Sequence, residues 1–358
     1  MPTGFYRLKV DKIVRETADA VSIRFLVPPP LKAMFDYKAG QFLTLHAMIN
    51  GQDIRRSYSV CESPYLDEMP TVAVKMVDDG RMSKFLNETL KEGDLIEAMP
   101  PMGNFTVIPD PARSVHYVLF GGGSGITPLK SILKTVLYRE PLSRITLFYA
   151  NRDLESIIFK SKLETLKAEF DDRLEIVHIL DNPPSDWNGL SGMLDPTIIE
   201  RLVKVKIDAF ESAHFFICGP GGLMALVKST LQSMNIADDH IHLEYFTAVV
   251  HTDEELNAAA EEESDEIITR KVKIELYGME DEIEVKPNKT ILEAAQDAGL
   301  DPPFSCTVGV CTTCRAKLHS GRVKMDEREG LSDAEIEEGY ILTCQSHPLT
   351  GDVDLSYE

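Results

Sequence analysis

The sequence predicts a chain of three folded parts: a small antiparallel β-barrel, a doubly wound parallel α/β domain, and a small mixed-sheet domain that carries a cysteine loop. Three observations lead to this prediction. Short strand-like runs fill residues 1–110, strands alternate with helices over residues 111–248, and four cysteines lie within residues 269–358. The chain has 358 residues, which is enough for two or three domains.

The barrel prediction rests on six short runs that are rich in Val, Ile, Phe and Tyr and are separated by turn signals such as Asn50-Gly51. Six strands of this length favour a small antiparallel barrel. One helix, Met82–Leu90, is expected just after Asp79-Gly80-Arg81. The predicted strands are Phe5–Val14, Val21–Val27, Phe42–Ile49, Ser57–Val60, Thr71–Val77 and Asp94–Ala98.

The second part alternates strands with helices, which indicates a parallel sheet covered on both faces and ligands at the carboxyl ends of its strands. The predicted strands are Val115–Phe120, Ile145–Ala150, Leu174–Leu180, Ala213–Cys218 and Ile241–Tyr245. The predicted helices are Pro128–Leu137, Ser161–Phe170, Pro196–Val203 and Gly222–Met234.

The third part begins after an acidic segment, residues 249–268, that contains no Lys or Arg. Such a run repels itself and is typical of a linker, either a tether that lets the last domain move or a passive spacer. A hairpin follows, Lys271–Tyr277 and Glu282–Val285, with Gly278 at its turn. The helix Ile291–Ala298 is expected to end at Gly299 and to pack on a small mixed sheet.

Four cysteines carry the strongest chemical signal. Cys306, Cys311 and Cys314 have the spacing C-x4-C-x2-C, and Cys344 follows. This is the plant-type ferredoxin arrangement for a [2Fe–2S] cluster, in which one loop supplies three thiolates and a distant segment supplies the fourth. A structural zinc site is the alternative, although zinc sites usually carry two C-x2–4-C pairs.

Composition excludes several other functions. The formal net charge of −21 argues against nucleic acid or an anionic membrane as a partner, and fits either docking on a basic protein or solubility alone. Six cysteines in this pattern indicate a reduced compartment. Met1 to Val10 lacks an apolar core and no run of 18 apolar residues occurs, so neither a signal peptide nor a membrane span is expected, and the predicted location is cytoplasmic.

Two motifs in the barrel region suggest a flavin. Arg56 and Tyr58 lie on one face of a strand, where a guanidinium can bind a phosphate and a phenol ring can lie against a flat ring system. Gly80 to Ser83 opens a helix whose backbone amides and Ser83 hydroxyl can hold a pyrophosphate. Taken alone, the Arg56 motif is better explained by a surface Arg beside a core Tyr, and Ser83 can be a simple helix cap. The occurrence of both motifs in one barrel favours flavin binding.

Three further motifs follow strands of the α/β domain. Four glycines between Gly121 and Gly125 favour contact with a pyrophosphate. Arg152 would accept a 2′-phosphate of NADPH and Asp153 would bind a free 2′-hydroxyl of NADH, and the sequence leaves both open. Cys218 would lie beside the nicotinamide or be an ordinary buried cysteine. His240, His242 and His251 show no metal-ligand spacing.

Together these segments resemble the ferredoxin–NADP reductase family fused to a C-terminal plant-type ferredoxin. The resemblance covers nearly the whole chain, and implies an FAD-binding barrel, an NAD(P)-binding α/β domain and a β-grasp [2Fe–2S] domain. The family often has two glycines in the cluster loop, and Val308 takes the place of the first. The resemblance is carried by RRSYS, GRMS, GGGSGITP, FYANR, ICGP, HLEYF, CTVGVCTTC and GYILTCQSHPLTGDV.

The resemblance also implies residue roles. Catalytic roles fall to Ser59, Cys218 and Glu244, and Phe246 would shield the flavin ring. The implied cofactor-binding residues are Arg56, Ser57, Tyr58, Ser59, Ala73, Lys75, Gly80, Arg81, Met82 and Ser83 for FAD, and Gly121, Gly122, Gly123, Ser124, Gly125, Thr127, Pro128, Asn151, Arg152, Gly219 and Pro220 for NAD(P)H.

The predicted function is an NAD(P)H-dependent reductase that passes a hydride to FAD and single electrons through the cluster to the diiron oxygenase component of a multicomponent monooxygenase. Two alternatives stay open. One is a reductase for a Rieske-type or steroid hydroxylase oxygenase. The other is a non-enzymatic, cluster-based redox sensor.

Overall fold

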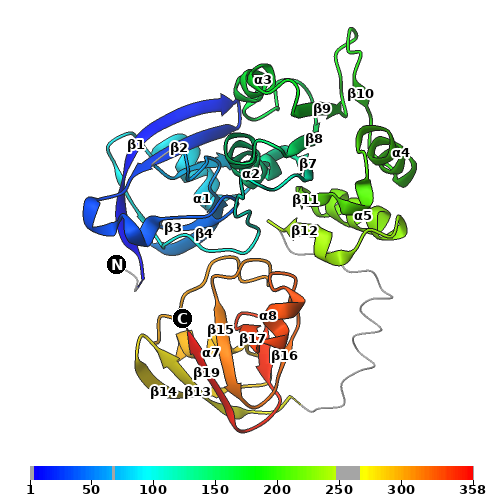
Figure 1. The fold of residues 1–358 in the computed structure, drawn as a ribbon. Coiled ribbons are helices and arrows are strands. Elements are labelled where there is room, and N and C mark those ends of the chain that lie inside the picture. The colour runs from blue at the N-terminus through cyan, green and yellow to red at the C-terminus, as the bar shows by residue number, and fades with distance from the viewer. Residues whose placement is uncertain (1–3, 67–68, 247–266, 358) are drawn as a thin grey trace. The chain divides into compact units, whose positions relative to one another are not determined.

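The structure is a computed structural model that describes residues 4–66, 69–246 and 267–357. The chain divides into two compact units, Tyr6–Phe246 and a C-terminal unit (Figure 1). Residues 249–266 of the predicted acidic linker lie outside the described residues. Among the described residues, no helix has both the length and the apolar character that crossing a bilayer requires.

The first sheet is a six-stranded antiparallel barrel with strand order β4-β3-β6-β1-β2-β5. A bridge between Val60 and Val72 joins the two end strands, and the Cys61 amide donates to the Thr71 carbonyl at 2.8 Å. These contacts close the sheet, so the predicted barrel is confirmed. The strands are β1 Tyr6–Thr17, β2 Ala20–Leu26, β3 Phe42–Ile49, β4 Gln52–Ser59, β5 Thr71–Lys75 and β6 Leu95–Ala98, with short helical turns at Pro29–Leu31 and Ala33–Phe35.

Two barrel elements differ from the prediction. Strand β4 begins at Gln52 rather than Ser57, because Asn50 and Gly51 both have positive φ and form a two-residue turn that pairs Ile49 with Gln52. The predicted helix Met82–Leu90 is split into α1, Arg81–Lys84, and a π-helical turn, Phe85–Thr89. The side chain of Asn87 donates to the Ser83 carbonyl at 2.9 Å and so competes with the α-helical ladder.

The second sheet is parallel, with strand order β10-β9-β8-β7-β11-β12, as predicted. After β7, the chain winds outward through β8, β9 and β10 and then returns to place β11 on the other side of β7. This reversal makes the carboxyl ends of β7 and β11 a topological switch point. The strands are β7 His116–Gly122, β8 Arg144–Asn151, β9 Leu174–Leu180, β10 Leu190–Ser191, β11 His214–Cys218 and β12 Ile241–Glu244.

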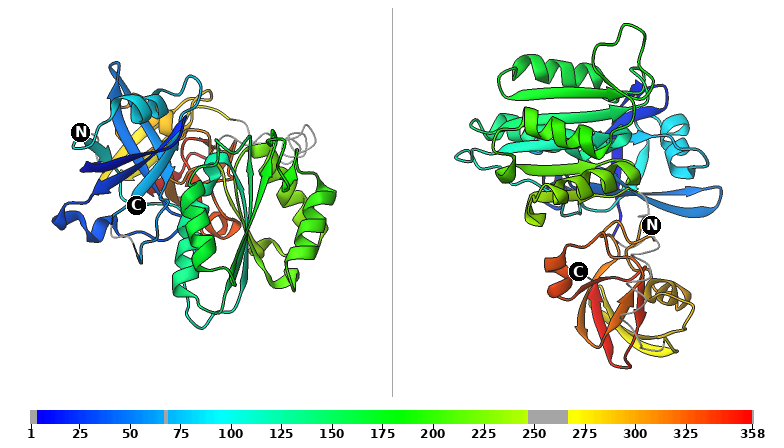
Figure 2. Two further views of the ribbon diagram at one scale, coloured as in Figure 1. Left: turned by 90° about the horizontal axis from the view of Figure 1, so that it is seen from above. Right: turned by 90° about the vertical axis from the view of Figure 1, so that its right-hand side faces the viewer.

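Helices cover both faces of this sheet (Figure 2). Leu119 of β7 packs in one core with Leu129 and Leu163, whereas its neighbour Phe120 packs in the other core with Met224. This alternation follows from the opposite directions of successive strand side chains. The helices are α2 Ile126–Arg139 and α3 Lys160–Glu169 on one face and α4 Pro196–Lys206 and α5 Gly221–Ser233 on the other, with short turns at Gly123–Gly125, Phe210–Ser212 and Asp238–His240.

The C-terminal unit has a mixed sheet of order β14-β13-β19-β15-β17 and a small β16-β18 ladder. Tyr277 and Gly278, both with positive φ, make the predicted hairpin turn. The helix α7, Ile291–Asp297, starts with a capping box between Thr290 and Glu293 and buries Ile291 against the sheet. The other elements are β13 Arg270–Leu276, β14 Met279–Val285, β15 Arg315–Ser320, β16 Val323–Met325, α8 Asp333–Glu337, β17 Tyr340–Leu342, β18 Ser346–Pro348 and β19 Val353–Tyr357.

Candidate functional site

The switch point of the parallel sheet brings three predicted site residues into one row. Gly121 of β7 is in register with Cys218 of β11, and Cys218 is in register with Glu244 of β12. The hydroxyl of Ser59, at the end of barrel strand β4, donates to Glu244 Oε2 at 3.0 Å. The fold therefore joins the predicted catalytic residues Ser59, Cys218 and Glu244, although 185 positions separate the first from the last.

Burial determines the protonation states of Glu244 and Cys218. It raises the pKa of the Glu244 carboxyl to about 8, against a smaller lowering by the Ser59 hydrogen bond. Burial also raises the pKa of Cys218, and the neighbouring Glu244 adds to the effect. At neutral pH the row thus presents a mostly protonated acid and a thiol rather than two anions.

Two glycine turns face each other beside this row. A Cβ on Gly125 would lie 2.0 Å from the Cys218 carbonyl oxygen, and a Cβ on Gly122 would lie 2.6 Å from Cδ of Pro220. The turns after β7 and β11 therefore need glycine for their own packing. Gly123 has φ +52°, and a Cβ there would meet no described atom within 4 Å. Its backbone is open to an approaching ligand, which fits a pyrophosphate or nicotinamide cradle.

Hydrogen bonds hold this open turn in place. The Tyr149 hydroxyl donates to the Gly123 carbonyl at 2.9 Å, and the Thr127 hydroxyl donates to the Ser124 carbonyl at 3.0 Å. Thr127 and Pro128 are buried in the first turn of α2. These two hydrogen bonds stabilise the conformation of the turn.

The barrel side of the site is strand β4. Arg56 is exposed and donates to the Arg55 carbonyl at 2.7 Å. The Ser57 hydroxyl lies 3.1 Å from the Thr44 hydroxyl, and burial raises the pKa of Tyr58. On β5, Ala73 is buried, and Lys75 Nζ lies 3.7 Å from Asp19.

The Gly80–Ser83 turn is held by hydrogen bonds of the Ser83 hydroxyl. The Ser83 hydroxyl accepts from the Val77 amide at 3.2 Å and donates to the Gly80 carbonyl at 3.0 Å. A Cβ on Gly80 would lie 2.3 Å from that hydroxyl oxygen. Ser83 therefore stabilises the turn itself, and the backbone amides of Arg81 and Met82 are left as the groups to meet a phosphate.

The end of β8 holds the predicted ribose-binding residues. Both side-chain amide atoms of Asn151 are buried without a hydrogen-bond partner among the described residues. Asp153 accepts from Ser156 N at 2.9 Å and from Arg152 Nε at 2.9 Å. The Asp153 carboxylate is thus used within its own turn, whereas the side chain of Arg152 is 64% exposed.

The four cysteines lie together in the C-terminal unit. The amides of Val308 and Cys311 each point at Cys306 Sγ at 3.4 Å. Hydrogen bonds from the Cys311 and Cys344 thiols lower the pKa of Cys306. Four clustered sulfurs, with backbone amides aimed at one of them, fit an iron–sulfur cluster because iron binds thiolates and amides stabilise them.

The cluster loop depends on unusual backbone conformations. Thr307 and Gly309 have φ +59° and +75°, and a Cβ on Gly309 would lie 2.5 Å from the side chain of Glu327. Gln345 Nε2 donates to the Thr307 carbonyl at 3.0 Å and so ties the Cys344 segment to this loop. Sequence reasoning did not single out Gln345, although its place directly after Cys344 was a usable signal.

Phe246 is the last described residue of its unit and is 39% exposed. Other residues near the site were missed because their contacts are made across the fold. Glu62, Lys130 and Lys134 belong to this group, and no local pattern marks them.

Comparisons with known proteins agree with this geometry. Residues 7–107 match the oxidoreductase FAD-binding domain family, residues 119–229 the oxidoreductase NAD-binding domain family, and residues 274–349 the 2Fe-2S iron–sulfur cluster binding domain family. The chain is also 36% identical to a subunit of the 1,2-phenylacetyl-CoA epoxidase of Escherichia coli, over 99% of this chain and 98% of the relative. The chain belongs to the ferredoxin–NADP reductase family, with a C-terminal ferredoxin domain.

Two further proteins place the reductase within this family. It is 35% identical to the ferredoxin reductase component of the 3-ketosteroid-9-alpha-monooxygenase of Rhodococcus rhodochrous, over 98% of this chain and 96% of the relative. Its fold matches phthalate dioxygenase reductase with a TM-score of 0.59 and 25% identity, over 99% of this chain and 98% of the other. The reductase is an NAD(P)H-dependent oxidoreductase with FAD and a [2Fe–2S] cluster, and the predicted family, fold class and cofactors are confirmed.

Proposed function

We propose that the reductase takes electrons from NADPH and delivers them to the oxygenase of a phenylacetyl-CoA epoxidase. The acceptor is supported by the 36% identity to the epoxidase subunit of Escherichia coli over almost the full length of both chains. A diiron oxygenase that receives single electrons is the partner that this assignment implies.

The observation that carries the reductase chemistry is the contact between the two halves of the Tyr6–Phe246 unit. Ser59 ends the strand proposed to bind FAD, and Glu244 ends a strand beside the glycine turn proposed to bind the nicotinamide. Because this hydrogen bond joins a barrel strand to the nucleotide sheet, the fold can bring two ring systems together there. FAD accepts a hydride and releases electrons singly, which nicotinamide does not readily do.

The chain's residues are assigned to binding, orientation and proton control. Arg56, Ser57, Tyr58 and the Gly80–Ser83 turn bind and orient FAD. The turns at Gly121–Pro128 and Gly219–Pro220 bind the nicotinamide nucleotide, and Glu244 holds a proton at its carboxyl beside Ser59 and Cys218. Cys306, Cys311, Cys314 and Cys344 hold the cluster.

NADPH is favoured over NADH by the geometry at the end of β8. Both carboxylate oxygens of Asp153 accept hydrogen bonds within its own turn, so Asp153 is poorly placed to accept a hydrogen bond from a ribose hydroxyl. Arg152 contacts Asp153 through Nε, and the rest of its guanidinium, on a side chain that is 64% exposed, can meet a 2′-phosphate.

We also propose domain boundaries near residues 110, 248 and 268, and a cytoplasmic location. The matched ranges 7–107, 119–229 and 274–349 support the boundaries. Six cysteines without a disulfide support a reducing compartment.

The decisive test of the electron route is the variant Cys311→Ser. It should lose NADPH-driven reduction of cytochrome c, because the cluster lacks a thiolate, while NADPH still bleaches the flavin at the wild-type rate. Unchanged cytochrome c reduction would refute the route through the cluster. A colourless, zinc-containing protein would instead support a structural or sensing role.

The acceptor is tested by turnover with purified oxygenases. Epoxidation of phenylacetyl-CoA by its oxygenase should depend on the reductase and NADPH. A 3-ketosteroid hydroxylase or a Rieske-type oxygenase serves as the competing acceptor. Equal or faster turnover with either competitor would overturn the assignment to the epoxidase.

A further inference from the structure

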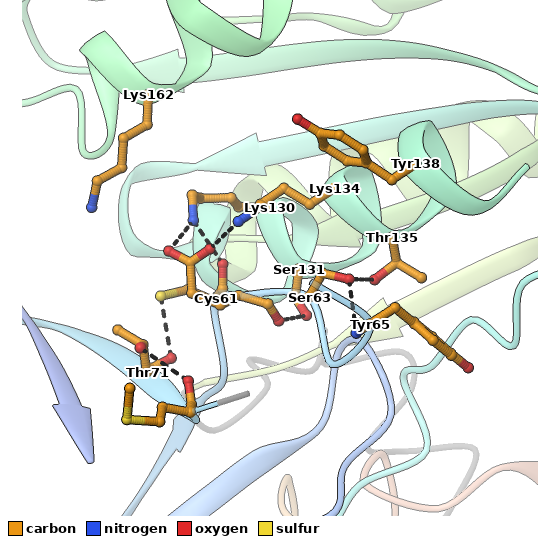
Figure 3. Close-up of polar contacts among 12 residues, drawn as sticks. Cys61, Ser63, Tyr65, Thr71, Lys130, Ser131, Lys134, Thr135, Tyr138 and Lys162 are labelled. Atoms are coloured by element: carbon orange, nitrogen blue, oxygen red, sulfur yellow. Dashed lines mark hydrogen bonds and ion pairs between the residues drawn. The ribbon is translucent and has the colours of Figure 1, made fainter. Parts of the chain in front are cut away.

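A buried polar cluster joins the segment after β4 to helix α2 (Figure 3). Glu62 follows the barrel strand, and Lys130 and Lys134 lie one turn apart on α2. Lys130 Nζ is 2.6 Å from Glu62 Oε1, and Lys134 Nζ is 2.5 Å from Glu62 Oε2. One carboxylate thus binds two ammonium groups, and we call these three side chains the Glu62 clamp.

Backbone contacts reinforce the Glu62 clamp from both sides. Lys130 Nζ also donates to the Cys61 carbonyl at 2.9 Å, and the Ser131 hydroxyl donates to the Glu62 carbonyl at 2.6 Å. The hydroxyls of Ser63 and Thr135 lie 2.8 Å apart, one residue further along each element. The segment after β4 is therefore held to α2 along a full helical turn.

The Glu62 clamp is more buried than an ordinary surface ion pair, since the side chain of Glu62 is 15% and that of Lys134 16% exposed. Lys130 is 1% exposed, and its ammonium lies 4.7 Å from the centroid of the Phe159 ring. Burial would raise the pKa of Glu62, but the two lysine charges and their hydrogen bonds outweigh burial and lower it. Removing the carboxylate would leave two neighbouring ammonium groups without it in a largely buried contact, where the side chain of Lys130 is 2% and that of Lys134 16% exposed, and this favours separation of the two elements.

The position of the Glu62 clamp along the chain connects it to the site. Glu62 is three residues beyond Ser59, the end of the proposed flavin strand. Lys130 is three residues beyond Thr127, in the helix that starts at the glycine turn. The clamp therefore joins the element proposed to hold the flavin to the element proposed to hold the nicotinamide, close to where each meets its ligand.

We propose that Glu62 is a positioning residue for hydride transfer: by clamping Lys130 and Lys134, it fixes the glycine turn of α2 at the distance from strand β4 that the reaction requires. This inference rests on the proposed binding of FAD by β4 and of nicotinamide by the glycine turn. Transfer between two bound rings is sensitive to displacements of about 1 Å, so a loosened α2 lowers the rate more than it weakens nucleotide binding.

A second ion pair in the same unit provides the matched control. Glu16 of β1 and Lys162 of α3 also join the barrel to the parallel sheet, with a distance of 2.6 Å. Lys162 is 40% exposed and lies on a helix that does not follow the glycine turn. Glu16→Gln therefore breaks a contact between the same two halves that is made on α3 rather than on α2, although Lys162 and Lys130 both lie against the Phe159 ring.

The experiment compares the holoenzymes of wild type, Glu62→Gln, Lys134→Met and Glu16→Gln by anaerobic stopped-flow reduction with saturating NADPH. Glu62→Gln should slow flavin reduction by about tenfold or more, with a change in the nucleotide Kd of less than about threefold. The nicotinamide–flavin charge-transfer absorbance should weaken. Backbone amides over residues 121–131 should exchange hydrogen faster, which is a readout independent of activity. Glu16→Gln should match the wild type in all of these.

The outcomes separate this inference from the proposed function. If wild-type flavin is not reduced by NADPH, the proposed function fails. If the wild type reacts and Glu62→Gln keeps its rate, charge-transfer band and exchange pattern, the inference is overturned. It is also overturned if Glu16→Gln is slowed equally. Should Glu62→Gln not fold, Lys134→Met decides, because it removes one arm of the clamp; a wild-type rate in that variant overturns the proposal.

Discussion

At the scale of single residues, Glu244 is a carboxyl group whose protonation is changed by burial. Its carboxyl is buried where the barrel meets the parallel sheet, and its pKa is raised to about 8. A raised pKa means that the folded protein keeps the proton through pH 7. Between pH 4.5 and 8 the unfolded chain ionises this group and the folded chain does not, so the free energy of unfolding falls with rising pH in that range.

This shift predicts a pH dependence of flavin reduction. Above about pH 8, ionised Glu244 places a negative charge where a hydride must arrive, so the rate in wild type should fall. Glu244→Gln is neutral at every pH, so its rate of flavin reduction should not fall above pH 8. At pH 7 that rate should stay within about threefold of the wild-type rate. Stopped-flow measurements of flavin reduction from pH 6 to 9.5 test this pH dependence. If the rate of flavin reduction falls above pH 8 in both proteins, the titrating group is not Glu244.

Arg152 is expected to set nucleotide preference. Arg152→Ala should raise the KM for NADPH by about 10- to 100-fold, because charge-assisted hydrogen bonds to a phosphate are lost. The KM for NADH should change little, since NADH has no 2′-phosphate, and NADH is therefore the matched control. Steady-state kinetics with both nucleotides measures the ratio. Equal effects on both would place the role of Arg152 in the turn rather than at the ribose.

At the scale of elements, the strand and helix ends carry the site, and glycine makes their close approach possible. The turn after β7 packs directly on the turn after β11, so that a Cβ on Gly125 would lie 2.4 Å from the Cys218 carbonyl carbon. Backbone cannot move aside as a flexible side chain can. By contrast, a Cβ on Gly222, in the first turn of α5, would meet no described atom within 4 Å.

This contrast predicts opposite results for two similar substitutions. Gly125→Ala should destabilise the protein by about 1–3 kcal/mol and abolish rapid flavin reduction, because the turns must separate. Gly222→Ala should be neutral or stabilise by about 0.4–1 kcal/mol, since alanine favours a helix and the site is open. Thermal denaturation and stopped-flow reduction measure both. A tolerated Gly125→Ala would contradict the close packing of the two turns.

The same elements show what the sequence can and cannot predict. The proposed cluster ligands follow from spacing because three of the four thiolates come from one loop, Cys306 to Cys314. The parallel sheet follows from alternating apolar runs. The Ser59–Glu244 and Glu62–Lys130 contacts join residues 185 and 68 positions apart, and no local pattern encodes them. Strand β10, Leu190–Ser191, is too short to show any periodicity.

At the scale of the whole molecule, one chain holds the binding domains for nicotinamide, flavin and cluster. Covalent connection makes the step from flavin to cluster intramolecular, with an effective concentration set by the chain rather than by the solution. The net charge of −21 also opposes close approach of two reductase molecules. Both effects favour electron flow within a molecule over flow between molecules.

The rate of cluster reduction after flavin reduction should therefore stay constant over an about tenfold range of protein concentration. Rapid-mixing spectra that follow flavin and cluster absorbance measure this rate. A mixture of Cys311→Ser, which keeps its flavin reaction, with Gly125→Ala, which keeps its cluster, provides the complementary test. Because electrons would have to cross between two acidic molecules, the mixture should not restore cytochrome c reduction. Restored cytochrome c reduction in the mixture, or a rate of cluster reduction proportional to protein concentration, would show that the flavin of one molecule reduces the cluster of another.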